Sequence, residues 1–263
     1  MDVERLERLD NILLRGILKS HSKTPIESLH QELGTINIKY ILASRRILYL
    51  HNILTKDKKE IVPKYYFAQK EKPSRGDFCQ MVARDMKEIK LYLSEDEITK
   101  SNKKFFKKLV KQKCRQTAID NFKKLQLSHK KVRDIQYVTH EPQTYLTSSM
   151  FNDRERGVLL SLRTHMTRNM KANFTKQFKT HSCQLKCDIT SLDSQEHLMV
   201  CTELSPHIEK HMRDIQYNDM YSQDIHKQLG VAKLFVQLLD LRDKRLEELE
   251  SSPAGAGPAA LSV

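Results

Sequence analysis

The chain has 263 residues, a hydrophobic content of 39% and a formal net charge of +13 at pH 7. It contains no run of about 18 apolar residues, which excludes an ordinary transmembrane helix, and its charged first residues are unlike a secretory signal. We therefore expect a nuclear or cytoplasmic protein that is not secreted and has no membrane as partner. Only 7 glycines and 7 prolines are present, and such sparse turn signals favour long helices over many short strands.

Two amphipathic helices are expected first. The periodicity of residues 4–20 predicts a helix whose apolar stripe is formed by Leu6, Leu9, Leu13 and Ile17. Thr24, followed by a proline and then by Glu27, has the pattern of a capping box with a first-turn proline. We therefore expect the second helix over 25–33, with its end at Gly34.

The most apolar segment, residues 36–54, predicts a buried helix that carries Arg45 and Arg46 as a basic ridge. β-Branched residues cluster over 35–38, so a short strand there is the alternative. The polar residues 55–77 predict a connector that includes a short helix at 65–69.

Two more helices are expected in the middle of the chain. Residues 78–93 have helical periodicity, and Ser94 with Glu97 forms another capping-box pattern. The segment that begins near Lys103 combines one apolar stripe with a lysine-rich face. The apolar positions are Phe106, Leu109, Val110, Cys114, Ala118, Phe122 and Leu125.

The C-terminal half also favours helices. Residues 135–138 have the composition of a short strand, residues 153–174 predict a helix, and Pro206 starts another. A last amphipathic helix is expected over 231–249, with Leu234, Leu238, Leu241 and Leu246 on its apolar side. The predicted fold class is mainly α: several short helical modules, a small cysteine-containing knuckle near residues 181–204 and a disordered tail with too few apolar residues for a core.

Three cysteines and one histidine lie close together in the spacing C-x3-C-x9-H-x3-C: Cys183, Cys187, His197 and Cys201. Thiolate and imidazole are ligands that Zn²⁺ prefers, and four of them close a tetrahedral shell. His197 and Cys201 stand four apart in a segment that has helical character, so both would share one helix face. We predict one structural zinc ion in a segment too small to fold by hydrophobic burial alone.

Other interpretations of this cluster stay open in the sequence. His181, His207 and His211 are rival ligands, and the four residues could also be ordinary thiols beside a surface histidine. A disulfide is disfavoured because no signal places the chain in an oxidising compartment.

Most of the positive charge lies in one segment. Between Lys103 and Arg133, twelve lysines and arginines stand against the single acid Asp120. A charge run on a helix is usually only a solvated face, but here almost no acids balance the bases. Nucleic-acid phosphate is the partner that this density favours, and Phe105 beside the stripe is available to stack on a base.

We predict nucleic-acid contacts from basic residues in three places. The first is the pair Arg45 and Arg46. The second is the basic segment, with Lys103, Lys104, Lys107, Lys108, Lys111, Lys113, Arg115, Lys123, Lys124, Lys130, Lys131 and Arg133. The third lies ahead of the cysteines, with Arg163, Arg168 and Lys171.

Catalytic signatures are scarce. The sequence has no G-x-x-x-x-G-K-[ST] loop, no G-x-S-x-G elbow and no Asp-Asp pair to hold the two metals of a nucleic-acid polymerase. One enzyme-like pattern is Asp77 followed by Glu88 and Lys90, the order found in many metal-dependent nucleases. Those residues normally lie on strands, whereas 78–93 has helical periodicity, so we expect no catalytic residue in this chain.

Several short motifs follow one another along the chain. They are LRGILKSHSKTPIESL at 14–29, ELG at 32–34, ASRRILYLH at 43–51, KPSRGDF at 72–78, LRTHM at 162–166 and QEHL at 195–198. In this order they resemble the region downstream of the polymerase domain in non-LTR (LINE-type) retrotransposon reverse transcriptase polyproteins, over about residues 5–245. The last motif, with Cys201, matches the CCHC element of that family, whose usual C-x2-C is C-x3-C here.

The resemblance implies a thumb- and linker-like helical region followed by a zinc knuckle, which in the family grip template RNA and target DNA beside the polymerase. The polymerase domain has no counterpart in these residues, so we expect no RNA-directed DNA polymerase activity from this chain alone. The implied partners are RNA, DNA and a reverse transcriptase domain. The implied organisation is a thumb- and linker-like region over 1–57, a connector over 58–77, a basic helical region over 78–145, a helical lead-in over 146–180, the knuckle over 181–204, C-terminal helices over 205–249 and a tail over 250–263.

The leading hypothesis is therefore a nucleic-acid-binding C-terminal fragment of such a polyprotein. One alternative is a metal-dependent nuclease that uses Asp77, Glu88 and Lys90. The other is a protein-interaction remnant, in which the terminal leucine helix pairs with a partner and the basic face only keeps the chain soluble.

Overall fold

The computed structural model describes residues 3–74, 76–128, 141–167, 182–187, 193–208, 212 and 214–251. These residues form eleven α-helices and short 3-10 turns, with no β-strand among them, and the mainly α fold class is confirmed. The chain divides into two compact units. The first unit contains α1 to α7, and the second contains α8, α9, α11 and α12 together with residues 18–25. None of the described helices combines the length and apolarity that crossing a bilayer requires.

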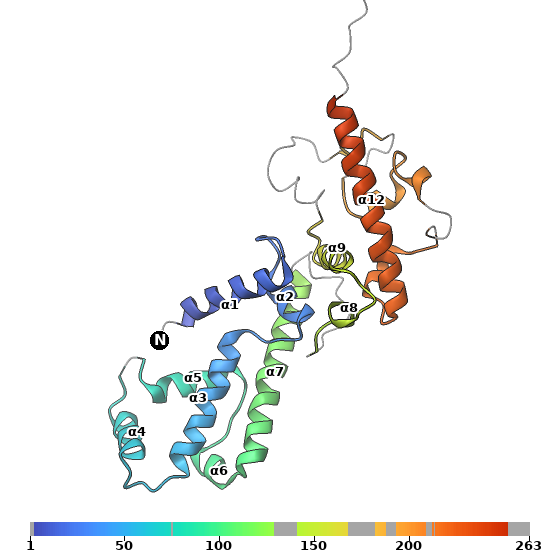
Figure 1. The fold of residues 1–263 in the computed structure, drawn as a ribbon. Coiled ribbons are helices and arrows are strands. Elements are labelled where there is room, and N and C mark those ends of the chain that lie inside the picture. Colours follow the sequence, from blue (N-terminus) through green and yellow to red (C-terminus); the bar gives the residue numbers. More distant parts are fainter. Residues whose placement is uncertain are drawn as a thin grey trace, which may run out of the picture. The chain divides into compact units, whose positions relative to one another are not determined.

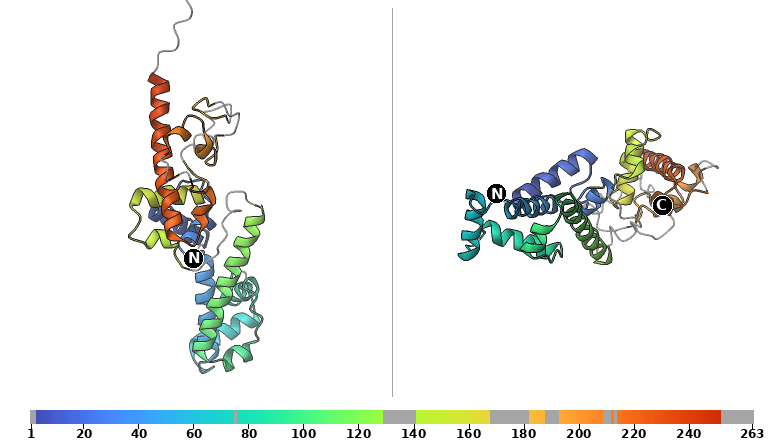
Figure 2. Two further views of the ribbon diagram at one scale, coloured as in Figure 1. Left: turned by 90° about the vertical axis from the view of Figure 1, so that its right-hand side faces the viewer. Right: turned by 90° about the horizontal axis from the view of Figure 1, so that it is seen from below.

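The first unit is built around α3 (Ile38–Leu54), which lies beside α7 (Lys103–Ser128) in all views of Figures 1 and 2. Asn37 caps α3 by accepting a hydrogen bond from the Lys39 amide at 2.9 Å. Asn102 does the same for α7, with the Lys104 amide at 2.9 Å. The alternative strand at 35–38 is wrong, because this segment leads directly into α3.

Three shorter helices complete the core of this unit. They are α4 (Ile61–Glu71), α5 (Phe78–Glu88) and α6 (Glu95–Lys100), all packed against α3. The core they share is apolar and almost fully buried, with Tyr40, Ile47, Leu50, Ile53, Tyr66, Val82, Ile89, Leu91, Ile98, Phe106, Val110 and Cys114. The apolar stripe predicted for α7 thus faces the interior.

The ends of these helices differ in part from the expectation. The Ser94–Glu97 capping box is confirmed, with the Ser94 amide donating to Glu97 at 2.7 Å. In contrast, α5 ends at Glu88 although periodicity extends to residue 93. The reason is the left-handed backbone of Lys90 (φ 54°), which lets the Leu91 amide donate to the Met86 carbonyl at 2.9 Å and closes the helix. In the expected connector, α4 is an eleven-residue helix.

The apolar stripe predicted for α1 (Val3–Leu18) is largely outside the core. Leu9, Leu13 and Ile17 are between 51% and 66% exposed, and Ile12 between them is also exposed. Leu14, one residue further round the helix, is buried instead.

The second helix, α2 (Ile26–Glu32), begins and ends close to the expected positions. Gly34 follows it with a φ of 62°, the left-handed conformation that glycine adopts readily after a helix. The predicted capping box is wrong, because Oγ1 of Thr24 has no hydrogen-bond partner among the described residues.

In the second unit α12 (Ile225–Ser251) packs beside α9 (Asp153–Arg163), as Figure 1 shows. α8 (Thr144–Thr147) and the 3-10 turn η4 (Tyr217–Tyr221) also contact α12. α12 begins six residues before the expected start. Its predicted apolar positions Leu234 and Leu238 are fully buried, so they belong to the core of this unit.

Two expected helices are shorter than the sequence suggested. α9 starts with a capping box between Asn152 and Glu155 and ends at Arg163, where Thr164 returns a hydrogen bond to the Leu160 carbonyl at 2.8 Å and His165 turns to a φ of 51°. Pro206 lies in a single 3-10 turn, η2 (Ser205–His207). The expectations for 135–138, for 168–174 and for most of the tail lie outside the described residues.

Candidate functional site

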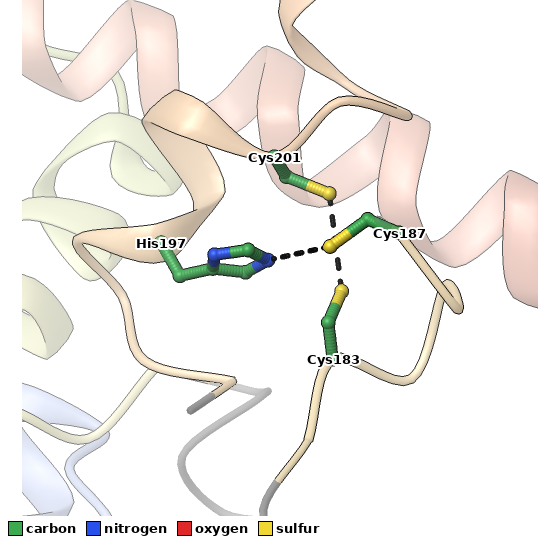
Figure 3. Close-up of side chains that lie close together, drawn as sticks. All are labelled: Cys183, Cys187, His197 and Cys201. Carbon is green, nitrogen blue, oxygen red and sulfur yellow. Dashed lines mark hydrogen bonds between the residues drawn. The ribbon is translucent and has the colours of Figure 1, made fainter. Parts of the chain in front are cut away.

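The four predicted metal ligands come together in the second unit. Their ligand atoms all lie within 4.8 Å of one another, and Figure 3 shows the three sulfurs and the imidazole converging. The sulfurs of Cys183 and Cys201 are 3.8 Å apart, and Cys187 Sγ is 3.3 Å from Nε2 of His197. Tetrahedral zinc with bonds of about 2.3 Å to sulfur and 2.0 Å to nitrogen places its ligand atoms about 3.5–3.8 Å apart. We call these four residues the metal cluster; it can hold a metal ion such as zinc.

A tight turn places the two cysteines of the C-x3-C pair. Lys186 adopts a φ of 54°, and its amide donates to the Cys183 carbonyl at 3.1 Å. This backbone reversal brings Cys187 back towards Cys183, so three intervening residues are compatible with a shared metal. The other two ligands flank α11 (His197–Val200), a single helical turn that matches the expected i, i+4 relation.

Burial makes the metal cluster a poor place for unpaired thiolates. Cys201 is fully buried and Cys183 nearly so, while all five cysteines of the chain are free of disulfides. Burial raises the pKa of the Cys201 thiol to about 12, and it also raises the pKa of Cys183. A divalent cation reverses this preference, since it stabilises the thiolate form that binds it.

A buried polar contact, which the sequence patterns did not predict, joins the segments around the metal cluster to α12. Nη2 of Arg242 donates to Oδ2 of Asp193 at 2.9 Å and to Oε1 of Gln184 at 2.6 Å. The side chains of Arg242 and Asp193 are only 4% and 1% exposed. A signal was present, because Arg242 follows Phe235 and Leu238 at helical spacing and so occupies the buried stripe of α12.

A second contact ties the same segment to α9. The fully buried Gln195, two residues before His197, donates from Nε2 to the Leu162 carbonyl at 2.9 Å. Its Oε1 accepts from Thr167 at 3.3 Å. The segment that carries the four ligands is therefore packed into a larger helical unit, with contacts to both α9 and α12.

Of the three rival histidine ligands, only His207 lies within the described residues, and it does not belong to the metal cluster. His207 lies exposed in η2, outside the group of converging side chains. His181 and His211 lie outside the described residues.

The predicted basic segment forms the exposed face of α7 in the first unit. Eight of its predicted contact residues are exposed: Lys103, Lys104, Lys107, Lys108, Lys111, Arg115, Lys123 and Lys124. Lys113 is half-buried. Within the described stretches of the chain none of them takes part in an ion pair, so their charges are available to an external anion. Phe105, the predicted stacking residue, is 63% exposed at the start of the same helix.

Four of these residues share one side of the helix. Lys104, Lys108, Lys111 and Arg115 follow one another at steps of four, three and four, which keeps them on one face. We call them the α7 stripe. At a rise of about 1.5 Å per residue the stripe is about 16 Å long.

The predicted arginine pair on α3 separates into one exposed and one structural residue. Arg45 is exposed. Arg46 makes a two-pronged ion pair with Asp85 of α5, with Nε–Oδ2 and Nη2–Oδ1 distances of 2.5 and 3.0 Å. A guanidinium held in this way is already neutralised, so Arg46 serves the packing of α3 on α5.

The prediction that Arg163 contacts nucleic acid is wrong. Its side chain is buried, Nη1 donates to the Met220 carbonyl at 2.7 Å and Nη2 to Oε1 of Gln143 at 3.2 Å. The guanidinium also lies over the rings of Tyr145 and Tyr221. Its place after Leu159 and Leu160 on the buried stripe explains this role. The predicted contacts Lys130, Lys131, Arg133, Arg168 and Lys171 lie outside the described residues.

The nuclease pattern does not form a site. Asp77 is the N-cap of α5 and accepts hydrogen bonds from the amides of Gln80 at 2.8 Å and Ser74 at 2.7 Å. Glu88 ends the same helix, about 16 Å away at the helical rise, and pairs with Lys39 at 3.1 Å. Lys90 supplies the left-handed residue that closes the helix. Asp77 and Glu88 cannot share a metal ion.

Comparison of the chain with models of known protein families, with curated proteins and with solved structures found no match. The features that bear on function are therefore the metal cluster and the basic face of α7.

Proposed function

We propose that this chain binds nucleic acid and that the exposed basic residues of α7 contact its phosphates. We also propose that one structural zinc ion holds the metal cluster together. The observation that carries the proposal is the α7 stripe. Four basic side chains on one helix face have no ion-pair partner among the described residues, and Asp120 is the single acidic residue of that helix. Contact with phosphates would relieve the repulsion among these basic side chains, and it would release counterions from the nucleic acid.

The length of the basic face suits a polyanion better than a small anion. The stripe covers about 16 Å of the helix. Phosphates of a single strand follow one another at about 3.4 Å along a duplex axis, so a helix of this length can contact several of them. A single phosphate or carboxylate would leave most of these basic side chains without a partner.

The metal cluster supports the proposal as a structural element. Zinc sites with four protein ligands are closed to substrate and stabilise a fold. Here the four ligands join the turn after Cys183 to the one-turn helix at His197, and the Arg242–Asp193 contact joins this segment to α12. We assign the zinc a folding role and no catalytic one.

We further propose that the chain corresponds to the C-terminal, post-polymerase region of a LINE-type reverse transcriptase polyprotein. The support is the order of the short motifs together with the Cys-Cys-His-Cys cluster near the end. The genomic sequence upstream of Met1 tests this assignment. An open frame that encodes an Asp-Asp polymerase motif supports it, and a flank without any trace of a polymerase contradicts it.

Binding by the basic face is tested by neutralising the α7 stripe. A variant with Lys104→Gln, Lys108→Gln, Lys111→Gln and Arg115→Gln should bind a labelled 30-nucleotide RNA or DNA at least about tenfold more weakly at moderate salt, because four phosphate contacts are lost. Fluorescence anisotropy measures the affinity.

The matched control removes the same charge elsewhere on the first unit. Lys59, Lys64, Lys72 and Lys87 are exposed and lie outside α7. Changing these four to glutamine should leave most of the affinity intact. Equal losses in both variants would mean that only total charge matters, and unchanged binding by the stripe variant would rule out α7 as the contact surface.

A further inference from the structure

A cavity of about 320 Å³ lies in the first unit beside the basic face. Its walls come from α1, α2, the start of α3 and the second half of α7. The side chains that matter below are Glu7, Glu27, His30, Tyr40, Asn121 and Phe122. The volume is at the small end of the range of about 300–1,000 Å³ for ligand sites, which suits a single heterocyclic ring system and not a long chain.

The inner wall offers flat apolar surface next to fixed polar groups. Tyr40 and Phe122 are 4% and 5% exposed, so both rings are held by the core of the unit. Nδ2 of Asn121 donates to the Tyr40 hydroxyl at 2.6 Å, which fixes the amide. Nδ1 of His30 is 2.9 Å from Oγ1 of Thr35, which fixes the imidazole. Apolar walls with a few oriented polar groups are what a nucleobase requires.

The charges around the cavity exclude phosphate as its occupant. Two carboxylates, Glu7 and Glu27, line it. The one lysine in the lining, Lys39, already pairs with Glu88 at 3.1 Å and lies over the Tyr40 ring. A carboxylate instead accepts hydrogen bonds, as from the exocyclic amino group of cytosine. Phosphates have their own place nearby, because Arg115 of the α7 stripe precedes Phe122 by seven residues, which is about two helical turns along the same face.

We propose that this cavity receives one unstacked base of a bound single strand and prefers a base with an exocyclic amino group. The inference rests on the proposed function, because the strand is brought there by the α7 lysines. Glu7 and Glu27 would accept hydrogen bonds from the amino group, while Asn121 and His30 face the remaining edge of the base. Uracil and thymine, which present carbonyl oxygens to the same carboxylates, fit less well.

The test compares two pyrimidine ligands that differ only at position 4 and at the adjoining N3, which carries a hydrogen in uracil and none in cytosine. Oligo-C and oligo-U of twelve nucleotides carry the same charge, and cytosine has an amino group where uracil has an oxygen. The full chain should bind oligo-C at least about fivefold more tightly than oligo-U, in line with the discrimination of roughly 1–3 kcal/mol expected of good side-chain contacts to a base. The ratio of the two affinities is the readout, because a change in overall charge affects both ligands equally.

The variant Glu7→Gln with Glu27→Gln should bring the ratio close to one, since the amides can also donate to the uracil oxygen. Its control, Glu71→Gln with Asp96→Asn, removes the same charge at exposed positions outside the cavity and should keep the ratio. Equal binding of both oligonucleotides by the unmodified chain, or a preference that persists in the Glu7/Glu27 variant, overturns the base pocket alone. Failure to bind either oligonucleotide overturns the proposed function with it.

Discussion

Cys201 illustrates how strongly burial acts on a single side chain in this protein. Its thiol is fully buried, its pKa is raised to about 12, and two other cysteines converge on it. At neutral pH the buried thiols of Cys183 and Cys201 are therefore protonated when no metal is bound. A cation that replaces these protons gains four ligands and directly links the turn after Cys183 to the one-turn helix at His197.

The first prediction concerns the metal itself. The full chain, purified under reducing conditions, should contain close to one zinc per molecule by elemental analysis. Cys201→Ser should lose the metal and lower the thermal unfolding midpoint, because metal binding contributes directly to folding in such sites. His207→Ala is the matched control and should keep both properties. Purified protein without zinc, or a Cys201→Ser variant that retains it, would show that the cluster is not a metal site.

His30 gives a prediction for acid stability. Burial lowers the pKa of this imidazole, and the nearby Asp10 and Glu27 only partly oppose the effect. Below about pH 6.5, the usual value for histidine, the unfolded chain therefore binds a proton more readily than the folded chain. The free energy of unfolding should therefore fall as the pH drops below about 6.5. Above that pH His30 is neutral in both states, and this destabilising effect disappears.

Urea unfolding at pH 7.5 and at pH 5.5 measures this effect. His30→Gln, which cannot titrate, should show a smaller difference between the two pH values than the unmodified chain. An identical difference in both proteins would assign the acid sensitivity to other groups.

At the scale of elements, the ion pair between Arg46 and Asp85 joins α3 to α5. Asp85 is only 4% exposed and Arg46 20%. Removing the arginine leaves a buried carboxylate without its partner, which costs on the order of 3 kcal/mol for pairs of this kind. Arg46→Met should therefore lower the free energy of unfolding by about 2–3 kcal/mol.

The neighbouring Arg45 provides the control for this prediction. It is exposed on the same helix, so Arg45→Met should change stability by less than about 0.5 kcal/mol. Chemical denaturation gives both values, and the double variant Arg46→Met with Asp85→Leu should recover some of the loss. Equal effects of the two single substitutions would mean that the Arg46–Asp85 contact does not hold the helices together.

Local sequence signals predicted where helices form better than they predicted which side of each helix is buried. The capping box at Ser94, the apolar stripe of α7 and the four converging ligands could all be recognised because each depends on residues close together in the sequence. α1 shows the limit, because apolar residues occur on more than one of its sides. Periodicity could not decide that Leu14 is buried while Leu13 is 63% exposed.

Contacts between distant residues could not be predicted in this way. Asp193 and Arg242 are 49 residues apart, and their contact depends on how α12 packs against the metal cluster. Arg46 stands next to the exposed Arg45 in the sequence, and only the packing of α5 against α3 makes it a structural residue. The hydrogen bond of Arg163 to the Met220 carbonyl likewise joins residues 57 apart in the sequence. The cavity beside α7 likewise exists only because α1, α2 and α7 meet.

At the scale of the whole molecule, the charge and the metal cluster belong to different units. The α7 stripe lies in the first unit, and the four ligands lie in the second. The net charge of +13 is concentrated in the basic segment, so the attraction of the chain for a polyanion should come chiefly from one helix. The proposed zinc ion would then have a separate role, which is to stabilise the fold of the second unit.

The salt dependence of binding is the sharpest test of the proposed role of α7. If about six phosphates are neutralised, the slope of log affinity against log salt should be near −5 for a DNA duplex and near −4 for a single strand. The α7 stripe variant should show a slope closer to zero by about three to four. An affinity of the unmodified chain that does not change between low and moderate salt would contradict the account.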